Sequence, residues 1–142
     1  MVSRLLIAAM LIAAAFDGSA QTPPPPTKKC AANQPECVIT VTVPAPCNAC
    51  KPKVDHDAVA IEKGNKNQIT WKIATPNYAF DRTKGIDFTD DPSGSVFKCH
   101  AEQNAAIYVC TNAHPITKPY KYTVNVTGAG NPTPLDPWVV NE

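Results

Sequence analysis

Alternation of apolar and polar residues is the strongest pattern along this chain. In the segment CVITVTV, residues 37–43, apolar side chains alternate with two threonines, which is the period of a half-buried β-strand. The segments NQITWKIA, residues 67–74, and YKYTVNV, residues 120–126, alternate in the same way. The side chains that we expect in the core are Ile39, Val41, Ile69, Trp71, Ile73, Ile107, Val109, Tyr122 and Val124.

Shorter strand candidates surround these three segments. They are residues 58–65, which run into a Gly-Asn turn, and residues 77–80, 85–88, 95–99, 105–110 and 138–140. Turn sequences such as DDPSG, residues 90–94, separate them. No window has a helical period, and the fifteen prolines disfavour long helices. The pattern therefore predicts an all-β fold, an antiparallel β-sandwich of about seven or eight strands.

The first twenty residues have the pattern of a secretory signal peptide. Arg4 gives a positive start, a twelve-residue apolar run follows, and small residues lead to a cleavage site expected after Ala20. The apolar run is too short to span a hydrocarbon layer of ~30 Å. Residues 21–29, QTPPPPTKK, predict an extended proline-rich lead, a stiff spacer rather than a peptide for a proline-binding groove. Residues 30–142 are then expected to form a single domain.

The charge balance limits the class of partner. The formal net charge is +1, and loss of Arg4 and Asp17 with the signal leaves it unchanged. A generic nucleic-acid binder needs many phosphate contacts, so no nucleic-acid partner is expected. No later apolar segment is long enough to span a membrane after signal cleavage. We expect a periplasmic or secreted protein. Its partner is unknown, and another exported protein is one candidate.

Six cysteines in an exported chain predict three disulfides. Cys99 and Cys110 end two runs that should pair as neighbouring strands, so we expect them to be bonded to each other. In the chain-entropy model a bridge across so short a loop stabilises the fold by roughly 3 kcal/mol.

The other four cysteines lie close together in the sequence. Cys37 and Cys47 flank a strand, and nine extended residues at ~3.3 Å each place them too far apart to bond. Cys30 with Cys37 and Cys47 with Cys50 is the simplest scheme. Cys30 with Cys47 and Cys37 with Cys50 remains open.

The CxxC motif CNAC, residues 47–50, has two further interpretations. In a dithiol oxidoreductase such a motif begins a helix, which lowers the pKa of the attacking thiol. No helix is predicted here. A zinc site with Cys47, Cys50 and His56 would lack the second cysteine pair that zinc usually has. Neither interpretation is favoured over a disulfide.

Two longer segments resemble a known fold family. Residues 59–73, VAIEKGNKNQITWKI, resemble the strand, turn and strand before the first copper ligand of cupredoxins. Residues 107–126, IYVCTNAHPITKPYKYTVNV, resemble the cupredoxin ligand loop and final strand. The resemblance covers residues 37–127 and implies a Greek-key β-sandwich, exported, in some members with one copper ion for electron transfer.

A copper site of that family needs two imidazoles, one thiolate and a weak axial ligand, often Met. By position Cys110 would supply the thiolate and His114 one imidazole. Asn77 and Tyr78 stand where the other imidazole is expected, and the chain after residue 20 contains no Met.

Cys99 bears on the same question because it is well placed to oxidise Cys110. We therefore expect no cofactor, with copper as the alternative held by Cys110, His114 and His100. A looser copper or zinc site with His100 and His114 is a further alternative. His114 precedes Pro115, which favours an extended, exposed loop position.

Motifs for other chemistry are weak. The chain has no G-x-S-x-G nucleophile motif and no phosphate-binding glycine loop. Asp87, Asp90 and Asp91 gather before a turn but lack the twelve-residue calcium-loop pattern. We expect a small exported, non-catalytic binding or structural module without metal. The alternative is a periplasmic metal-binding, copper-containing or electron-transfer protein of cupredoxin type.

Overall fold

Twelve β-strands make up the computed structural model, which describes residues 21–64 and 67–142. No helix occurs in these residues, and so none that could cross a membrane. The signal peptide expected at residues 1–20 lies outside the described residues. The strands are β1 (Lys28–Cys30), β2 (Cys37–Thr42), β3 (Lys53–Val54), β4 (Ala58–Ile61), β5 (Gln68–Ile73), β6 (Tyr78–Phe80), β7 (Ile86–Phe88), β8 (Phe97–Ala101), β9 (Ile107–Asn112), β10 (Lys118–Val124), β11 (Val126–Gly128) and β12 (Trp138–Asn141).

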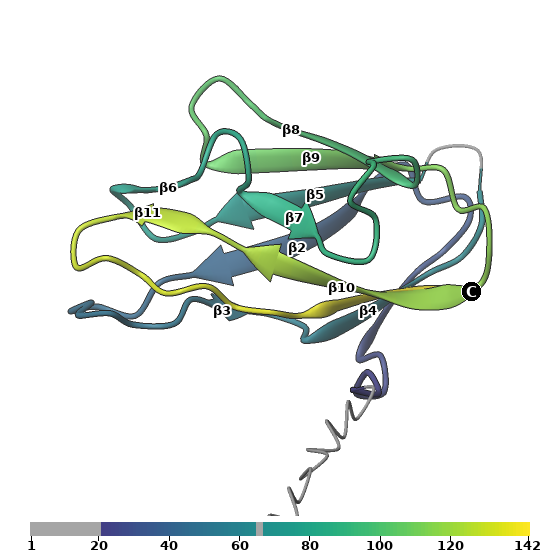
Figure 1. The fold of residues 1–142 in the computed structure, drawn as a ribbon, viewed down its shortest axis with the longest axis horizontal. Helices are drawn as coiled ribbons and strands as arrows, with labels where there is room; N and C mark the ends of the chain where they lie inside the picture. The colour runs from purple at the N-terminus through teal and green to yellow at the C-terminus, as the bar shows by residue number, and fades with distance from the viewer. Residues whose placement is uncertain (1–20, 65–66) are drawn as a thin grey trace, which may run out of the picture.

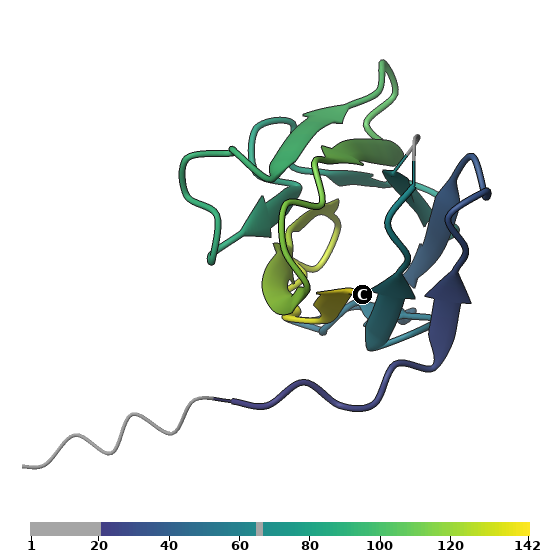
Figure 2. The same cartoon turned by 90° about the vertical axis from the view of Figure 1, so that its right-hand side faces the viewer.

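Two five-stranded sheets form the body of the protein (Figure 1). The first sheet has the order β1-β4-β12-β10-β7, and the second sheet has the order β3-β2-β5-β9-β8. A small pair, β6 with β11, adds to them. Seen along the strands, the two sheets enclose a common core (Figure 2).

The expectation of an all-β fold is confirmed, but the expectation of a purely antiparallel fold is wrong. β1 and β12 both pair with β4 in parallel, and β2 pairs with β5 in parallel. Alternation predicts a strand but says nothing of its direction, so the parallel pairs could not be seen in the pattern. The predicted number of strands, about seven or eight, was also too low, because several of the twelve strands have only two or three residues and give no clear alternation. β1 begins at Lys28, two residues before the domain start expected at Cys30.

Aromatic contacts join the two sheets in the core. The ring of Trp71 on β5 lies 5.3 Å from the ring of Tyr122 on β10 and 6.3 Å from that of Phe88 on β7, each centroid to centroid. Such edge-on pairs add to the free energy gained by burying the rings. The buried apolar side chains form one core cluster between the sheets. Six of the residues that we expected in the core belong to it: Ile39, Val41, Ile69, Trp71, Tyr122 and Val124.

The core prediction was only partly right for β9, because Val109 is buried and Ile107 is not. Tyr108 and Cys110 point into the core, whereas Ile107 is half-buried and Val109, although buried, lies outside the core cluster. All four side chains are apolar, so the sequence did not show which of the two alternating sets faces inward. Ile73, at the end of β5, is only partly buried and packs at the border of the core.

All six cysteines are in disulfides, which confirms the expected stapling. Of the two schemes left open for the first four cysteines, the structure has the simpler one. The bonded pairs are Cys30–Cys37, Cys47–Cys50 and Cys99–Cys110.

Each disulfide has a different place in the fold. Cys30 lies on β1 of the first sheet and Cys37 begins β2 of the second, so their bond connects the two layers along one side. Cys99 and Cys110 stand directly opposite each other on β8 and β9, so their bond connects neighbouring strands of one sheet.

Candidate functional site

The sulfur atom of Cys110 is not available as a metal ligand in this structure. Cys110 lies on β9, is 0 % exposed, and is bonded to Cys99. The prediction that Cys99 would take up this sulfur is therefore confirmed. A disulfide sulfur carries no thiolate charge, and the thiolate is the form that binds metals.

His114 is buried, which corrects the expectation of an exposed loop residue. Its side chain and backbone are only 2 % exposed, and its ring atom Nε2 lies 3.0 Å from the carbonyl oxygen of Ile61 on β4. Because a carbonyl oxygen only accepts, Nε2 carries the proton and donates it. The backbone N–H of His114 donates to Oδ1 of Asn112 at 2.9 Å.

The loop conformation at His114 also differs from the expectation. Its φ is +45°, in the left-handed region, although Pro115 was expected to favour an extended backbone. In this conformation the His114 N–H bonds to the Asn112 side chain, and the ring bonds to Ile61 at the end of β4. Tertiary contacts have thus outweighed the local preference.

A pair of buried amides continues the contacts of His114. Nδ2 of Asn112 donates to Oδ1 of Asn141 at 2.7 Å, and Nδ2 of Asn141 donates back at 3.3 Å. Asn112 ends β9 in the second sheet and Asn141 ends β12 in the first. We call Asn112, His114 and Asn141 the buried amide cluster, and it joins the ends of the two sheets.

The remaining positions of the expected copper site lie elsewhere. Asn77 is exposed in a turn with φ of +65°. The hydroxyl of Tyr78 donates to the carbonyl oxygen of Ala129 at 3.1 Å. The side chain of His100 is 64 % exposed, with Nε2 3.7 Å from a carboxylate oxygen of Glu102.

The donor atoms therefore do not fit a copper ion. Cys110 is bonded to sulfur, His114 is hydrogen-bonded to a carbonyl, and His100 is exposed to solvent on an edge strand. Among residues 21–64 and 67–142, no three or more His, Cys, Asp or Glu side chains converge in a way that could hold a metal. The looser site with His100 and His114 does not fit either, because the imidazole of His100 is exposed on β8 while that of His114 is buried and bonded to Ile61.

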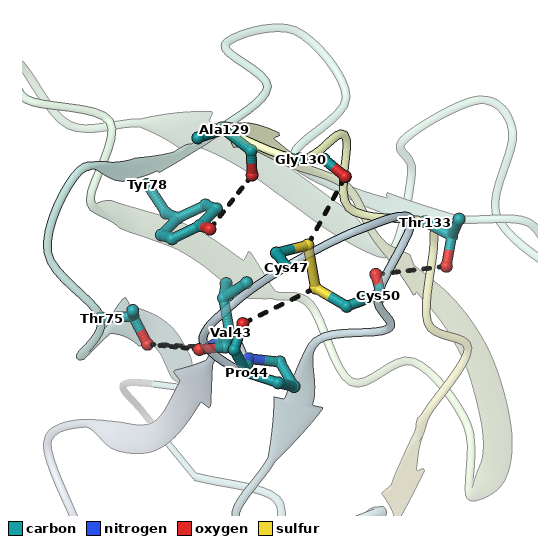
Figure 3. Close-up of a disulfide and its surroundings, with 9 residues drawn as sticks. All are labelled: Val43, Pro44, Cys47, Cys50, Thr75, Tyr78, Ala129, Gly130 and Thr133. Carbon is teal, nitrogen blue, oxygen red and sulfur yellow. Dashed lines mark hydrogen bonds between the residues drawn. A yellow bond between two sulfur atoms is a disulfide. The ribbon is translucent and has the colours of Figure 1, made fainter.

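The CxxC motif forms a tightly held loop at one end of the molecule (Figure 3). The N–H of Ala49 donates to the carbonyl oxygen of Gly130 at 2.7 Å, and the N–H of Thr133 donates to that of Cys50 at 2.8 Å. A Cβ on Gly130 would lie 2.1 Å from the carbonyl oxygen of Cys47, so only glycine fits there. The disulfide thus closes the loop after β2, and the two backbone hydrogen bonds fasten this loop to the loop before β12.

The zinc interpretation of this motif also fails in the structure. Cys47 and Cys50 are bonded to each other, and neither stands at a helix N-terminus that would stabilise a thiolate. Nδ1 of His56 lies 2.9 Å from the hydroxyl of Thr27, so its ring contacts the residue just before β1.

The acidic turn before β8 uses its buried carboxylate for the backbone. Oδ2 of Asp91 accepts from the N–H groups of Val96 and Phe97, both at 2.8 Å, and Oδ1 accepts from the N–H and hydroxyl of Ser95 at 3.0 and 2.9 Å. Burial alone would raise the pKa of Asp91. The hydrogen bonds from Phe97, Val96 and Ser95 outweigh it, so the pKa lies below its usual value.

These bonds leave Asp91 without the free lone pairs that a calcium ion would need. Of the other two carboxylates, Oδ2 of Asp90 accepts from the N–H of Lys121 at 3.1 Å, and Asp87 is exposed on β7. The turn is therefore part of the scaffold of the edge strand β8.

A groove of about 620 Å³ runs between the two edge strands on one side of the molecule, β7 of the first sheet and β8 of the second. Asp87, Phe88, Phe97 and His100 are among its lining residues. Tyr108 also lines it, and burial is the main cause that raises the pKa of its hydroxyl. A second hollow of about 510 Å³ lies on the outer face of the second sheet and is lined mainly by polar side chains.

Sequence reasoning missed the groove and the buried amide cluster. The groove arises where strands distant in the sequence end side by side, so no local motif signals it. The amide cluster did have a signal: Asn112 follows Cys110 at the strand period, which predicts that it shares the inward face.

Comparison with known proteins adds no assignment. No protein-family model matches this chain, and no curated protein sequence matches it.

Proposed function

We propose that this chain is a small exported, non-catalytic binding or structural module, a cupredoxin-like scaffold that works without copper. The observation that supports this most directly is the bond between Cys99 and Cys110. At the position of the expected thiolate ligand, the sulfur instead joins two strands. His114, at the position of an imidazole ligand, instead donates to the carbonyl oxygen of Ile61.

The buried polar side chains support a structural role. Asn112 and Asn141 bond to each other, His114 bonds to β4, and Asp91 bonds to the backbone of its own turn. A catalytic acid or base needs hydrogen-bond reach to a substrate, whereas these groups are engaged with the protein itself. Binding would then use surfaces, such as the groove between β7 and β8.

Three disulfides fit an oxidising compartment, where such bonds persist. Together with the signal-like pattern of residues 1–20, they support export. Expression of the full chain, followed by fractionation and N-terminal sequencing, tests this part. Export predicts a product that begins at Gln21 outside the cytoplasm, and a cytoplasmic product that begins at residue 1 contradicts it.

The metal-free part is tested on residues 21–142 purified with the disulfides intact. Thiol titration under denaturing conditions should find no free thiol. Addition of Cu(II) should give no blue absorption band, and metal analysis after dialysis should find no stoichiometric copper. A blue species with bound copper would support the copper alternative and overturn the proposal.

A further inference from the structure

The edge strand β8 has a defined set of backbone groups that face away from its sheet. The N–H of Ala113 donates to Val96, and the N–H of Glu102 donates to Ile107, at 2.8 and 2.9 Å. In an antiparallel pair, hydrogen-bonded residues alternate with residues whose N–H and C=O point away. Lys98 and His100 therefore bond toward β9, while Phe97, Cys99 and Ala101 direct their backbone groups outward.

Asp91 closes one end of this outward row. Its carboxylate accepts from the N–H of Phe97 at 2.8 Å, so that donor is already bound. By the same alternation, the N–H groups of Cys99 and Ala101 point away from β9. The free part of the edge is thus short and centred on His100.

The space beside this edge is open. β7, the edge strand of the other sheet, does not pair with β8, and the groove of about 620 Å³ lies between them. Figure 2 shows β8 at the rim of its layer. An unpaired edge of this kind is a template for another strand, and proteins normally protect it.

The side chains along the edge identify the strand that fits. Lys98, His100 and Glu102 follow at the strand period on the outer face, and all three are exposed. Lys98 carries a positive charge on one side of His100, and Glu102 carries a negative charge on the other side. An identical strand that runs antiparallel about His100 places each Lys98 opposite the Glu102 of the other copy. The edge is therefore complementary in charge to itself.

We propose that β8 pairs with β8 of a second copy of this chain, antiparallel and centred on His100. The backbone groups of Cys99 bond to those of Ala101 in the second copy, and the two-fold axis repeats this arrangement. The two His100 side chains face each other at the axis, with a pair of Lys98 and Glu102 on either side.

The neighbouring register is disfavoured for two reasons. A pairing centred on Cys99 would need the N–H of Phe97, which Asp91 occupies. It would also place Lys98 opposite His100 of the second copy, so the favourable pair with Glu102 would be lost. The Asp91 turn therefore disfavours the register centred on Cys99, and the pairs of Lys98 with Glu102 favour the one centred on His100.

Analytical ultracentrifugation of residues 21–142 at low ionic strength tests the proposal. The unaltered protein should show a dimer whose fraction rises with concentration. Lys98→Glu alone and Glu102→Lys alone each oppose like charges twice, because the axis repeats the pair, and each should weaken dimerisation about tenfold. Lys53→Glu on β3, at the opposite edge of the same sheet, makes the same charge change and should have no effect.

Mixing the two variants gives the decisive result. In a mixed dimer the carboxylate introduced by Lys98→Glu faces the ammonium introduced by Glu102→Lys, and on the other side of the axis the native Lys98 faces the native Glu102. An equimolar mixture should therefore dimerise as well as the unaltered protein. The double variant Lys98→Glu with Glu102→Lys should also recover. Ala101→Pro, which removes an outward N–H, should abolish dimerisation while the three disulfides still form.

Three outcomes overturn the proposal. The first is a protein that stays monomeric at every concentration up to about 1 mM, near the weak limit of specific association. The second is a mixture that dimerises no better than either variant alone. The third is an equal loss with Lys53→Glu, which would show an effect of net charge rather than of the β8 edge.

Discussion

The imidazole Nε2 of His114, in the loop after β9, donates to the carbonyl oxygen of Ile61 at the end of β4, 3.0 Å away. The bond joins the second sheet to the first at the end where Asn112 and Asn141 also meet. In a copper-binding cupredoxin, a histidine at this position would be a ligand of the metal. Here the ring closes one end of the core.

His114→Ala should lower the free energy of unfolding by about 1–3 kcal/mol, because the buried carbonyl of Ile61 loses its donor. Urea denaturation followed by tryptophan fluorescence measures the change. His100→Ala, at an exposed site, should change it by less than about 0.5 kcal/mol. Equal effects of the two substitutions would show that the His114 bond does not stabilise the fold.

Asp91→Asn should destabilise the protein at neutral pH and reduce its sensitivity to acid. The folded-state pKa of Asp91 is depressed, so its ionised form stabilises the fold above the unfolded pKa of about 3.9, and that contribution is lost as pH falls through the folded value. Unfolding free energies between pH 7 and pH 2 measure both effects. At pH 7 the free energy of unfolding of the variant should be about 1–3 kcal/mol lower than that of the unaltered protein. Between pH 7 and pH 2 the variant should then lose less of its free energy of unfolding than the unaltered protein does.

Asp87→Asn is the control for this experiment, because Asp87 is exposed on the neighbouring strand β7. Its pH profile should follow that of the unaltered protein. If the Asp91→Asn variant and the unaltered protein lost the same free energy of unfolding in acid, the hydrogen bonds to Asp91 would not favour its charged form.

Cys99→Ala frees Cys110 but should not create a blue copper site. The thiol would still lack two imidazoles, because His114 is bonded to Ile61 and an exposed Asn77 occupies the position of the other. Cu(II) titration of the variant, read by absorption spectroscopy, should give no intense blue band, while thiol titration finds one free thiol. A blue band would show that the loop can rearrange to bind copper.

Gly130→Ala should destabilise the CxxC end of the molecule by about 1 kcal/mol or more. The new Cβ would clash with the carbonyl oxygen of Cys47 at 2.1 Å, and the φ of Gly130 is +77°. Gly94→Ala is a matched control, since its φ is +63° but the nearest heavy atom to its Cβ is 3.6 Å away. Thermal unfolding of both variants separates the clash from the cost of the backbone angle; equal losses would rule the clash out.

Local patterns were sufficient for several features of this protein. The alternation around Ile39 and Trp71 predicted strands and their buried faces, because side-chain direction in a strand depends only on the period of two. The pairing of Cys99 with Cys110 could also be predicted, since a short loop brings two neighbouring strand ends together. Such features depend on residues that are close in the sequence.

The candidate site depended on contacts between distant segments. The strand pattern around Cys110 was apolar on both faces, and only packing against the first sheet turned Tyr108 inward and Val109 outward. The burial of His114 requires Ile61, which lies far away in the sequence, to supply an acceptor. No local preference at Pro115 could reveal that acceptor.

By itself, the sequence determined that the chain forms short β-strands, that its six cysteines form disulfides and that Cys99 pairs with Cys110, because strand period and loop closure act over a few residues. Only the tertiary structure decided the parallel pairs of β4 and the open edge of β8 that Asp91 limits. Strand order depends on which distant faces bury each other. The free energy of that burial is shared by the whole core, so no single segment encodes it.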